Sequence, residues 1–202
     1  MRIHKNLLDK NNPLKIGDIT LGERIAFSGK NYLWESRAGS TLDVIVIHYI
    51  SAALMDSKEP FKLDSILNIF PEYGVSSHYL ITRRGKIMML VPEEHKAWHC
   101  GGSIMPEPDN RKAVNDFSIG IELMATETSG FTAAQYASLA ALCSDIEKRY
   151  KRKFTYVGHD MIAGGRAVEL GLRTTVKVDP GPEFKWEQFY DLMKKNRVQK
   201  LA

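Results

Sequence analysis

The fold is decided by one stretch of the chain, Leu42-Asp43-Val44-Ile45-Val46-Ile47-His48-Tyr49-Ile50. Its nearly continuous run of β-branched side chains is typical of a strand that is buried on both faces of a sheet. A second buried strand is expected over Phe117 to Met124, and Phe154 to Val157 is a shorter β-prone run. These stretches predict a sheet at the centre of the molecule.

Three helices are expected around this sheet. Thr132 and Gln135 form a capping box, and apolar residues then recur at helical spacing, so a helix over 132–150 places one apolar stripe on the sheet. A second helix is predicted over 61–70, where the pattern stops at a proline, and a third over 183–194. We interpret the first of these as scaffold and expect the last to cover one face of the sheet.

A hairpin is predicted where two short apolar stretches flank a turn that contains glycine. Residues 77–82 and 87–92 supply the strands, with Gly85 in the turn between them. Three basic side chains accompany this turn, namely Arg83, Arg84 and Lys86. We interpret these charges as solvated, with contact to an acidic ligand as the alternative.

Composition limits the class of protein. A chain of 202 residues buries roughly 70% of its unfolded surface, so the core needs neither disulfides nor a structural metal, and any metal would serve chemistry. The 28 basic and 24 acidic residues are interspersed and give a formal charge of +4, which is weak support for nucleic acid, and we expect no nucleic-acid partner. Cys100 and Cys143 form no secreted-type framework and are interpreted as reduced thiols.

We expect a single domain with an arm. Residues 1–40 mix polar residues, proline and glycine with isolated apolar residues, and we predict an N-terminal arm there, then a domain over 41–196 and a tail over 197–202. No apolar run reaches the length of a membrane span, and the start lacks the apolar core of a signal peptide. The sequence therefore predicts a monomeric, cytoplasmic protein without a membrane partner.

Two polar residues stand out within the predicted strands. His48 stands near the end of its strand, where a histidine is either a satisfied core residue or a ligand, depending on its partners. Glu122 lies in the otherwise apolar stretch 117–124, where an unpaired carboxylate costs several kcal/mol. Burial would raise the pKa of Glu122 and suit it to act as a base near neutral pH. An edge position with Glu122 facing water is the alternative.

The C-terminal part of the domain adds three more candidates. His159 follows a β-prone run, and Asp179 lies in a Pro-Gly turn that can hold its carboxylate rigidly. His48, His159 and Asp179 form a set of three N/O ligands with a fourth position left for water, which is the open set of a catalytic zinc site. Zinc lowers the pKa of bound water to ~7, Glu122 would take its proton, and Lys177 could stabilise an oxyanion from the same side as Asp179. One catalytic zinc ion and amide hydrolysis are predicted.

Residues 94–103 have no clear period but contain side chains of the types found in binding sites. Trp98 and His99 precede a pair of glycines, and an aromatic ring beside an imidazole can form a groove wall that stacks on a sugar. A packed loop with a buried tryptophan is the alternative. His95, His99 and Cys100 suggest a zinc clip, but no second Cys or His pair follows at finger spacing, so we expect no structural zinc ion there.

Six motifs occur in an order that resembles a known family. They are Ile47-His48, Val75-Ser76-Ser77-His78-Tyr79, Lys96-Ala97-Trp98-His99, Asn115-Asp116-Phe117-Ser118-Ile119-Gly120-Ile121-Glu122-Leu123, Gly158-His159-Asp160-Met161-Ile162-Ala163 and Lys177-Val178-Asp179-Pro180-Gly181-Pro182. The set, over residues 42–190, resembles the zinc-dependent N-acetylmuramoyl-L-alanine amidases, and among them the bacterial cytosolic amidases that recycle anhydro-muropeptides. Their superfamily also contains peptidoglycan recognition proteins.

The resemblance implies a fold, a reaction and a set of site residues. The fold would be α/β, a single domain with a mixed central sheet flanked by helices, and the reaction would cleave the amide between N-acetylmuramic acid and L-alanine. Zinc would be held by His48, His159 and Asp179, with Glu122 as base and Lys177 as oxyanion stabiliser. Contacts with a muropeptide or peptidoglycan fragment are expected at Tyr49, His78, Trp98, His99 and Asn115.

The sequence departs from the family pattern in three places. Several members have a tyrosine directly before the position of His78, whereas this chain has Ser77, so Glu122 would act as base alone. The recycling branch tends to have asparagine where this chain has Tyr49, which bears on sugar contacts. The loop over 159–177 is longer than the compact form of the family and would reshape the peptide groove.

Two other functions compete with a recycling amidase. A cell-wall-lytic amidase, such as a phage endolysin or an autolysin, would use the same chemistry on intact peptidoglycan and would normally carry a wall-binding module or an export signal. A non-catalytic peptidoglycan recognition module usually lacks a ligand, whereas His48, His159 and Asp179 are all present.

Overall fold

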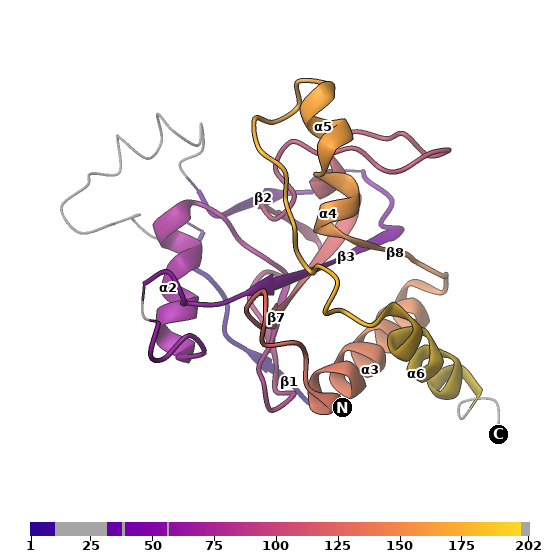
Figure 1. Ribbon diagram of the computed structural model, residues 1–202. Coiled ribbons are helices and arrows are strands. Elements are labelled where there is room, and N and C mark those ends of the chain that lie inside the picture. The colour runs from indigo at the N-terminus through magenta and orange to yellow at the C-terminus, as the bar shows by residue number, and fades with distance from the viewer. Residues whose placement is uncertain (11–31, 38, 56, 199–202) are drawn as a thin grey trace.

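Six strands form the central sheet of the computed structural model, which describes residues 1–10, 32–37, 39–55 and 57–198 (Figure 1). The strands are β1 (Ile3–Lys5), β3 (Val44–Ile50), β4 (Tyr79–Ile81), β5 (Ile87–Met89), β7 (Ser118–Met124) and β8 (Thr155–Gly158). Their order across the sheet is β1-β5-β4-β7-β3-β8. The β4 and β5 strands pair antiparallel and the other neighbours pair parallel, which confirms the predicted mixed sheet.

The β3 strand is the buried strand predicted first from the sequence, and that prediction is confirmed. Val44, Ile45, Val46 and Ile47 are fully buried, because β7 and β8 pair with the two edges of β3 and other elements cover both faces. Side chains alternate between the faces of a strand, so His48 shares a face with Val44 and Val46. That face carries the candidate functional residues.

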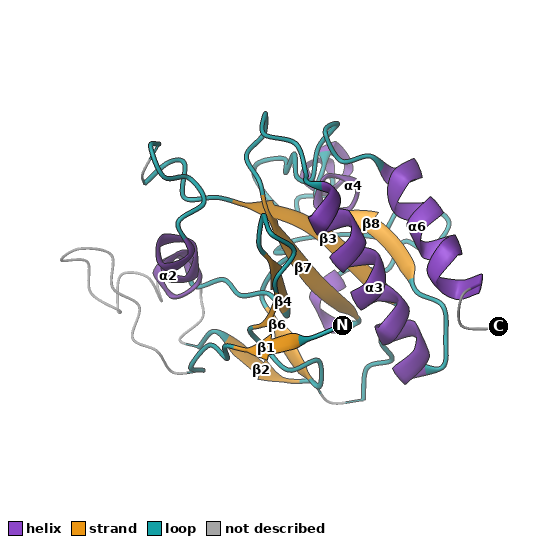
Figure 2. Ribbon diagram, turned by 90° about the horizontal axis from the view of Figure 1, so that it is seen from below, coloured by secondary structure: helices purple, strands orange, loops and turns teal. Residues whose placement is uncertain are grey.

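Helices cover both faces of the sheet. The helices α3 (Ala133–Tyr150) and α6 (Trp186–Val198) lie side by side on one face (Figure 2). The helices α2 (Leu63–Tyr73) and α4 (His159–Ile162) pack on the opposite face, which His48 shares. The predicted single domain with a mixed sheet flanked by helices is confirmed. Within the described ranges, no helix is both long and apolar enough to cross a membrane.

The predicted start of α3 is confirmed in atomic detail. The Gln135 N–H donates to Thr132 Oγ1 at 3.1 Å, and the Thr132 N–H donates to Gln135 Oε1 at 3.0 Å. These two bonds satisfy donors that a helix N-terminus leaves without intrahelical partners. The helix therefore begins at a fixed point and presents its apolar stripe to the sheet.

The α2 helix extends further than predicted. It continues through Pro71, because the proline removes only its own donor while the N–H groups of Gly74 and Val75 still reach the Phe70 carbonyl. Gly74 has a φ of 62° and ends the helix in the left-handed conformation. The proline therefore lies inside the last turn rather than marking the end of the helix.

The predicted hairpin of β4 and β5 is confirmed, but the interpretation of Arg83 as a solvated charge is wrong. The Arg83 Nη1 group donates to the Gly130 carbonyl at 2.6 Å and to the Met124 carbonyl at 3.2 Å. A partly buried guanidinium needs such acceptors, and here it ties the turn to the end of β7. Arg84 and Lys86 are exposed, as predicted.

The chain between β8 and α6 contains the short helices α4 and α5 (Gly165–Glu169), in a region where a turn and a short helical piece were expected. The α6 helix starts later than the predicted residue 183, because the Phe184 N–H closes a turn on the Gly181 carbonyl at 3.2 Å. It also ends later than predicted, at residue 198. A 3-10 helix, η1 (Val114–Asp116), precedes β7.

The described part of the N-terminal arm contributes strands to two sheets. The β1 strand pairs with β5 at the edge of the central sheet, and β2 (Trp34–Ser36) pairs antiparallel with β6 (His95–Ala97) in a separate small sheet. The rest of the arm, residues 11–31 and 38, lies outside the described residues, as do residues 199–202 of the predicted tail. The division into arm, domain and tail stays a prediction.

Candidate metal centre

Three side chains from distant parts of the chain converge where β8 ends, beside His48 in the carboxyl-terminal half of β3. The His48 Nδ1 atom lies 3.0 Å from Asp179 Oδ2, and the His159 Nδ1 atom lies 3.2 Å from the same oxygen. Ligand atoms of the three residues all lie within 4.8 Å of one another. The structure therefore brings together the three residues that were predicted to hold zinc.

Strand register places the two histidines. In the parallel pairing of β3 with β8, Ile47 lies opposite Gly158, so the next residues along the two strands are His48 and His159. In the pairing of β3 with β7, His48 lies opposite Glu122. Partners in a parallel pair present their side chains to the same face, so Glu122 and His48 share one face of the sheet.

Asp179 is brought to the histidines by a close backbone approach. Its carbonyl accepts the Asp160 N–H at 2.8 Å, which joins the turn at Asp179 to the start of α4. Pro180 packs directly on Gly158, where an added Cβ would lie 2.7 Å from the proline Cδ atom. A glycine is therefore needed at this position for the turn to reach His159.

The spacing of these ligand atoms fits a metal ion. Atoms bound ~2.0–2.2 Å from zinc at tetrahedral corners lie ~3.3–3.6 Å apart, and the two observed distances, 3.0 and 3.2 Å, are slightly shorter than this. A hydrogen bond on the side away from Asp179 also orients the ring of His159, since its Nε2 atom lies 3.1 Å from the Cys100 carbonyl oxygen. A hydrogen bond of this kind leaves Nδ1 as the ring nitrogen that faces a metal.

Electrostatics favours the protonation states that metal binding requires. Burial lowers the pKa of His48 to about 4, and the charge of His159 acts in the same direction. Burial raises the pKa of Asp179, but hydrogen bonds from His159 and His48, together with their charges, outweigh it and hold the pKa below its usual range. A neutral imidazole and an ionised carboxylate are the forms that bind a divalent metal.

Glu122 lies beside this group in a central strand, so the alternative of an edge position facing water is wrong. The β7 strand is flanked by β4 and β3. Glu122 is half-buried, and its Oε2 atom is buried without a hydrogen-bond partner in the described part of the chain. Burial and the nearby Asp179 carboxylate raise the pKa of Glu122 well above its ordinary value, while the Lys177 ammonium opposes the shift.

Lys177 lies on the exposed rim of the same site. Its backbone N–H donates to the Ala163 carbonyl at 2.9 Å, which fixes the segment leading to Asp179. The positive charge of Lys177 lowers the pKa values of both His48 and Glu122. The ammonium group is therefore close enough to act on charge that develops in the site.

Burial separates the five predicted substrate contacts into two groups. Tyr49 and Trp98 are half-buried and keep surface for a ligand. Tyr49 also lies within electrostatic reach of the site. Burial raises its pKa, and the negative charge of the Asp179 carboxylate raises it further. The other three residues have little or no exposed surface: His78 0%, Asn115 7% and His99 8%.

His78, His99 and Asn115 are buried and bind neighbours inside the protein, so substrate contact at these three residues stays a prediction. The His78 Nδ1 atom accepts the Gly120 N–H at 3.0 Å, and its Nε2 atom lies 3.0 Å from the His95 carbonyl. Burial lowers the pKa of His78 to about 3, so the ring is neutral. The ring of His99 contacts His48, and the Asn115 side-chain oxygen accepts two backbone N–H groups. These side chains support the site from inside the protein.

Sequence reasoning missed the place of His99 behind the site, although a signal existed. Gly120 interrupts an apolar strand, and a glycine there often marks a close approach of another group. A Cβ at Gly120 would lie 2.5 Å from the His99 Cγ atom. The glycine therefore makes room for an imidazole on the face that carries His48 and Glu122.

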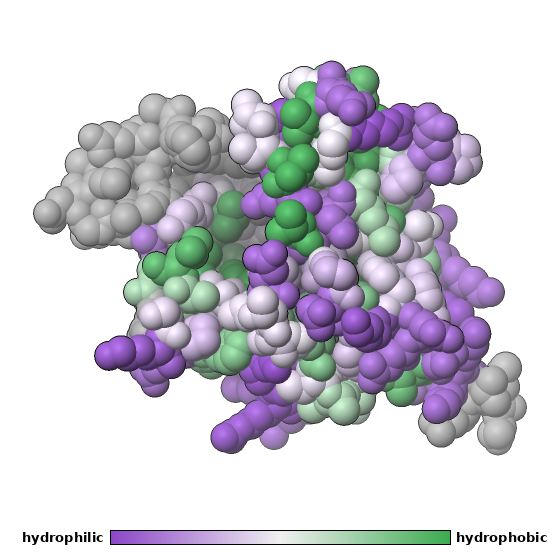
Figure 3. Space-filling model, viewed as in Figure 1, coloured by the Kyte–Doolittle hydropathy of each residue, from purple (hydrophilic) through white to green (hydrophobic). Residues whose placement is uncertain are grey.

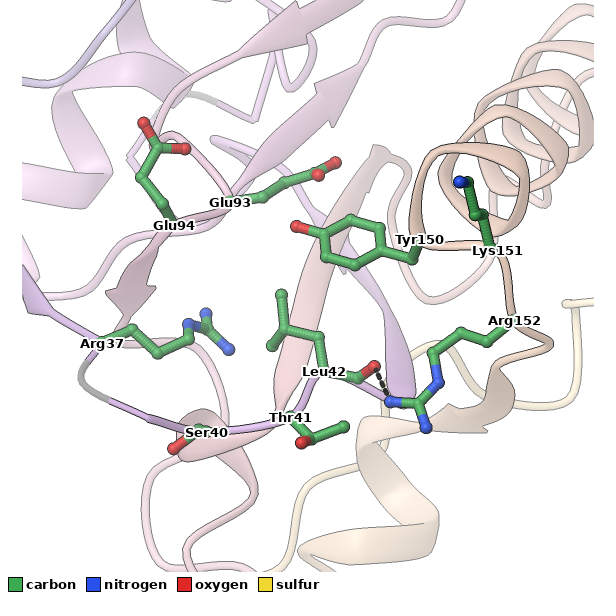
Figure 4. A pocket seen from close by; sticks show the side chains of 9 residues that line it. All are labelled: Arg37, Ser40, Thr41, Leu42, Glu93, Glu94, Tyr150, Lys151 and Arg152. Carbon is green, nitrogen blue, oxygen red and sulfur yellow. Dashed lines mark hydrogen bonds between the residues drawn. The ribbon is translucent and has the colours of Figure 1, made fainter.

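An open cavity of about 650 Å³ lies at the amino ends of β3 and β8, at the other end of the sheet from His48 and His159 (Figure 4). Two of its charged side chains, Arg37 and Glu93, already bind groups of the protein. The Arg37 guanidinium donates to the carbonyls of His95 at 2.8 Å and Ser118 at 2.9 Å, and Glu93 pairs with Arg149 at 2.6 Å. The group with convergent ligand atoms therefore remains the candidate for chemistry.

Comparison with known proteins defines the class. The sequence profile of the N-acetylmuramoyl-L-alanine amidases matches residues 38–182. Because this match covers most of the chain, the protein belongs to the N-acetylmuramoyl-L-alanine amidase family. The family resemblance inferred from the six motifs is confirmed.

Within this family the chain is similar to the 1,6-anhydro-N-acetylmuramyl-L-alanine amidase AmpD of several bacteria. It is 42% identical to the Citrobacter freundii protein over 120 residues, which are 59% of this chain and 57% of that protein. It is 36% identical to the Haemophilus influenzae protein over 168 residues, which are 76% of this chain and 83% of that protein. The matches to the enterobacterial AmpD proteins span only 57–60% of their length.

Two solved structures share the fold. A crystal structure of a selenomethionine AmpD derivative matches with a TM-score of 0.60 and 34% identity over 79% of this chain and 89% of that chain. The Escherichia coli amidase AmiD, in complex with anhydro-N-acetylmuramic acid-L-Ala-D-gamma-Glu-L-Lys, matches with a TM-score of 0.58 and 29% identity over 89% of this chain and 65% of that chain. Both likenesses confirm the predicted fold class.

The buried carboxyl of Glu122 predicts a pH-dependent cost to stability. Folding raises the pKa of Glu122, so the protonated form is favoured in the folded state, and stability falls as pH rises through the raised pKa. Glu122→Gln removes this charge, so the metal-free variant should melt at a higher temperature than the metal-free wild type at pH 8. Near pH 4, below the raised pKa, the two melting temperatures should agree.

The measurement is thermal unfolding followed by circular dichroism across pH 4 to 9 in the presence of a chelator. Glu127→Gln, at an exposed carboxyl in the loop after β7, is the matched control and should change the melting temperature little at any pH. If Glu122→Gln is not more stable than the wild type at high pH, Glu122 is not buried as an ionisable group.

Proposed function

We propose that this chain is a zinc-dependent N-acetylmuramoyl-L-alanine amidase that acts on soluble muropeptides. The observation that carries the proposal is the convergence of two imidazoles and a carboxylate beside Glu122 at one end of the sheet. The names of the relatives support the substrate class, since AmpD is named as a 1,6-anhydro-N-acetylmuramyl-L-alanine amidase and AmiD is described with an anhydro-muropeptide. The bond cleaved would join (anhydro-)N-acetylmuramic acid to L-alanine, as peptidoglycan recycling requires.

We assign the metal to His48, His159 and Asp179, with one zinc ion. Two neutral imidazoles and one carboxylate belong to the ligand types of catalytic zinc sites, which keep a further position for water. A bound zinc ion would lower the pKa of that water and polarise the amide carbonyl. The proton transfers and the positioning of the substrate then depend on the side chains of this chain.

Glu122 would act first as general base and then as general acid. Its Oε2 atom has no hydrogen-bond partner among the described residues, which supports a role in accepting a proton from the attacking water. The raised pKa of Glu122 lets the carboxyl group hold this proton near neutral pH and pass it to the departing nitrogen of L-alanine. The proton taken from water thus leaves with the amine, and Glu122 returns to its ionised form.

Lys177 would stabilise the negative charge that forms on the amide oxygen during attack. A fixed ammonium next to a developing oxyanion lowers the barrier because its attraction is stronger in the transition state than in the ground state. The electrostatic effect of Lys177 on both His48 and Glu122 supports its place at the reacting centre. Lys177 needs no partner other than the substrate for this role.

The rim of the site would supply contacts with the sugar and the stem peptide. Val176 and Val178, on either side of Lys177, are 52% and 54% exposed. Hydrophobic side chains gather over the loop between α5 and α6 beside a hollow of the surface (Figure 3). We include Tyr49 and Trp98 among the proposed contacts, since both keep exposed surface.

Two further parts of the proposal concern the state of the protein. We propose that it acts as a monomer in the cytoplasm, as predicted from the sequence. Size-exclusion chromatography with light scattering tests the first point, and fractionation of cells tests the second.

The direct test of function is mass spectrometry of the products from a defined anhydro-muropeptide. We expect the zinc-loaded protein to release the intact stem peptide with a free L-alanine amino group, together with the anhydro sugar. A chelator should abolish this release, and added zinc should restore it. Release from intact sacculi that is faster than from the soluble muropeptide would instead indicate a cell-wall-lytic amidase. Binding of muropeptide without turnover would indicate a recognition module.

Two substitutions should separate metal binding from proton transfer. Glu122→Ala removes the proton acceptor, so we expect turnover to fall by a factor of about 10² to 10⁴, the typical contribution of general acid–base catalysis, with zinc still bound. Asp179→Ala removes a ligand, so zinc content measured by elemental analysis should fall as well. An active Glu122→Ala protein, or an Asp179→Ala protein with full zinc content, would contradict the corresponding assignment.

A further inference from the structure

One buried segment, His99-Cys100, lies directly behind both candidate histidine ligands. His99 is 8% exposed and Cys100 is 1% exposed. The segment follows β6 and crosses the face of the sheet that carries His48 and Glu122, since the His99 ring lies over Gly120 of β7. It therefore contacts the site from inside the protein, on the side away from solvent.

The side chain of His99 contacts the first ligand. Its Nδ1 atom lies 3.0 Å from His48 Nε2, and the two rings meet edge to face with centroids 5.1 Å apart. The other nitrogen, His99 Nε2, lies 3.3 Å from Ser118 Oγ. A chain of polar contacts thus runs from His48 through His99 to Ser118 at the start of β7.

The backbone of Cys100 contacts the second ligand. Its carbonyl oxygen lies 3.1 Å from His159 Nε2 and accepts the proton of that nitrogen, because a carbonyl can only accept. His159 therefore holds its proton on Nε2 and turns Nδ1 toward Asp179. Two adjacent residues thus contact the two candidate ligands: the side chain of His99 contacts His48, and the backbone carbonyl of Cys100 contacts His159.

Asn115 holds the segment in place. Its Oδ1 atom accepts the backbone N–H of His99 at 3.1 Å and the backbone N–H of Cys100 at 2.8 Å. Asn115 lies in η1 and is 7% exposed. One amide oxygen therefore fixes both residues that stand behind the histidines.

The long loop before Asp179 contacts the chain at Cys100 and at Gly102, which follows the segment. A Cβ at Gly102 would lie 1.8 Å from the Leu172 carbonyl oxygen, so the two backbones are in direct contact. The Arg173 guanidinium lies 3.5 Å from the Cys100 carbonyl and 3.4 Å from the Gly102 carbonyl. The segment is thus enclosed between η1 on one side and this loop on the other.

We infer that His99 and Asn115 are positioning residues that set the orientation of both metal-binding histidines, an inference that rests on the proposed metal site. With His99 Nδ1 as acceptor, His48 carries its proton on Nε2, as His159 does through the Cys100 carbonyl. Both rings then present Nδ1 to the metal next to Asp179. Partners of this kind fix ring orientation and tautomer, and removing one typically weakens metal affinity.

A second arrangement of the same atoms is the competing explanation. Cys100 Sγ lies 3.1 Å from His99 Nδ1, so His48, His99 and Cys100 form another group that could hold an ion. The observations favour positioning, because the group with Asp179 also offers a carboxylate and lies beside Glu122. A thiolate ligand would leave a spectroscopic signature that a positioning role would not.

Two matched pairs of variants test the inference through zinc affinity. His99→Leu removes the acceptor, whereas His99→Asn, although smaller, keeps an oxygen near the position of Nδ1. Asn115→Ala removes the acceptor of two N–H groups, whereas Asn115→Asp keeps it. We expect His99→Leu and Asn115→Ala to weaken zinc affinity about 10- to 100-fold, and each polar variant to recover most of the loss. Ser144→Ala, a buried substitution in α3 on the side that contacts Met193 of α6, is the control for general loosening of the core.

The measurements are competition with a chelating indicator, circular dichroism to establish folding, and the absorption spectrum of the cobalt-substituted protein. If the wild type binds zinc and His99→Leu binds it equally tightly, the positioning role is overturned while the proposed metal site stands. If the Asp179→Ala variant binds zinc as tightly as the wild type does, the proposed metal site is overturned as well. A thiolate-to-cobalt band that Cys100→Ala abolishes would assign the metal to the second group and overturn the positioning role.

Discussion

The parallel pairing of β3 with β7 and β8 is the constraint on which the rest of the structure depends. Parallel strands end at the same edge of a sheet, and the register here places His48 opposite Glu122 and one residue beyond the Ile47–Gly158 pair. Chemistry that requires a base, two imidazoles and a carboxylate can then be assembled from residues more than a hundred positions apart. The helices on the other face keep this register fixed by burying the alternate side chains of the same strands.

Close backbone approaches complete the site. Gly158 admits Pro180 and so delivers Asp179, and Gly120 admits the His99 ring behind His48. In both places a glycine is required because another group occupies the space of a Cβ, not because of an unusual backbone angle. The energetic cost of the site lies elsewhere, in the polar groups that it buries. Glu122 keeps a buried oxygen without a hydrogen-bond partner among the described residues, which is typical of a group reserved for a substrate.

The sequence predicted the elements whose signals are local and missed those that depend on contacts across the fold. The strand at 44–50, the capping box of α3 and the hairpin follow from periodicity and capping within a few residues. The types of chemistry were also predictable, because His48 and Glu122 interrupt apolar stretches and Asp179 lies in a rigid Pro-Gly turn. The burial of His78, His99 and Asn115 was not predictable, since the same motifs fit a packed interior and a binding groove equally well. Arg83 was misinterpreted for the same reason, because its acceptors lie in a distant loop.

Diffraction at the zinc absorption edge tests most directly whether a metal binds between His48, His159 and Asp179. In crystals of the zinc-loaded protein, the account predicts one anomalous peak, ~2.0–2.2 Å from His48 Nδ1, His159 Nδ1 and an Asp179 oxygen. A peak between His48 Nε2, His99 and Cys100, or no peak near Asp179 in a protein that hydrolyses muropeptide, would contradict it.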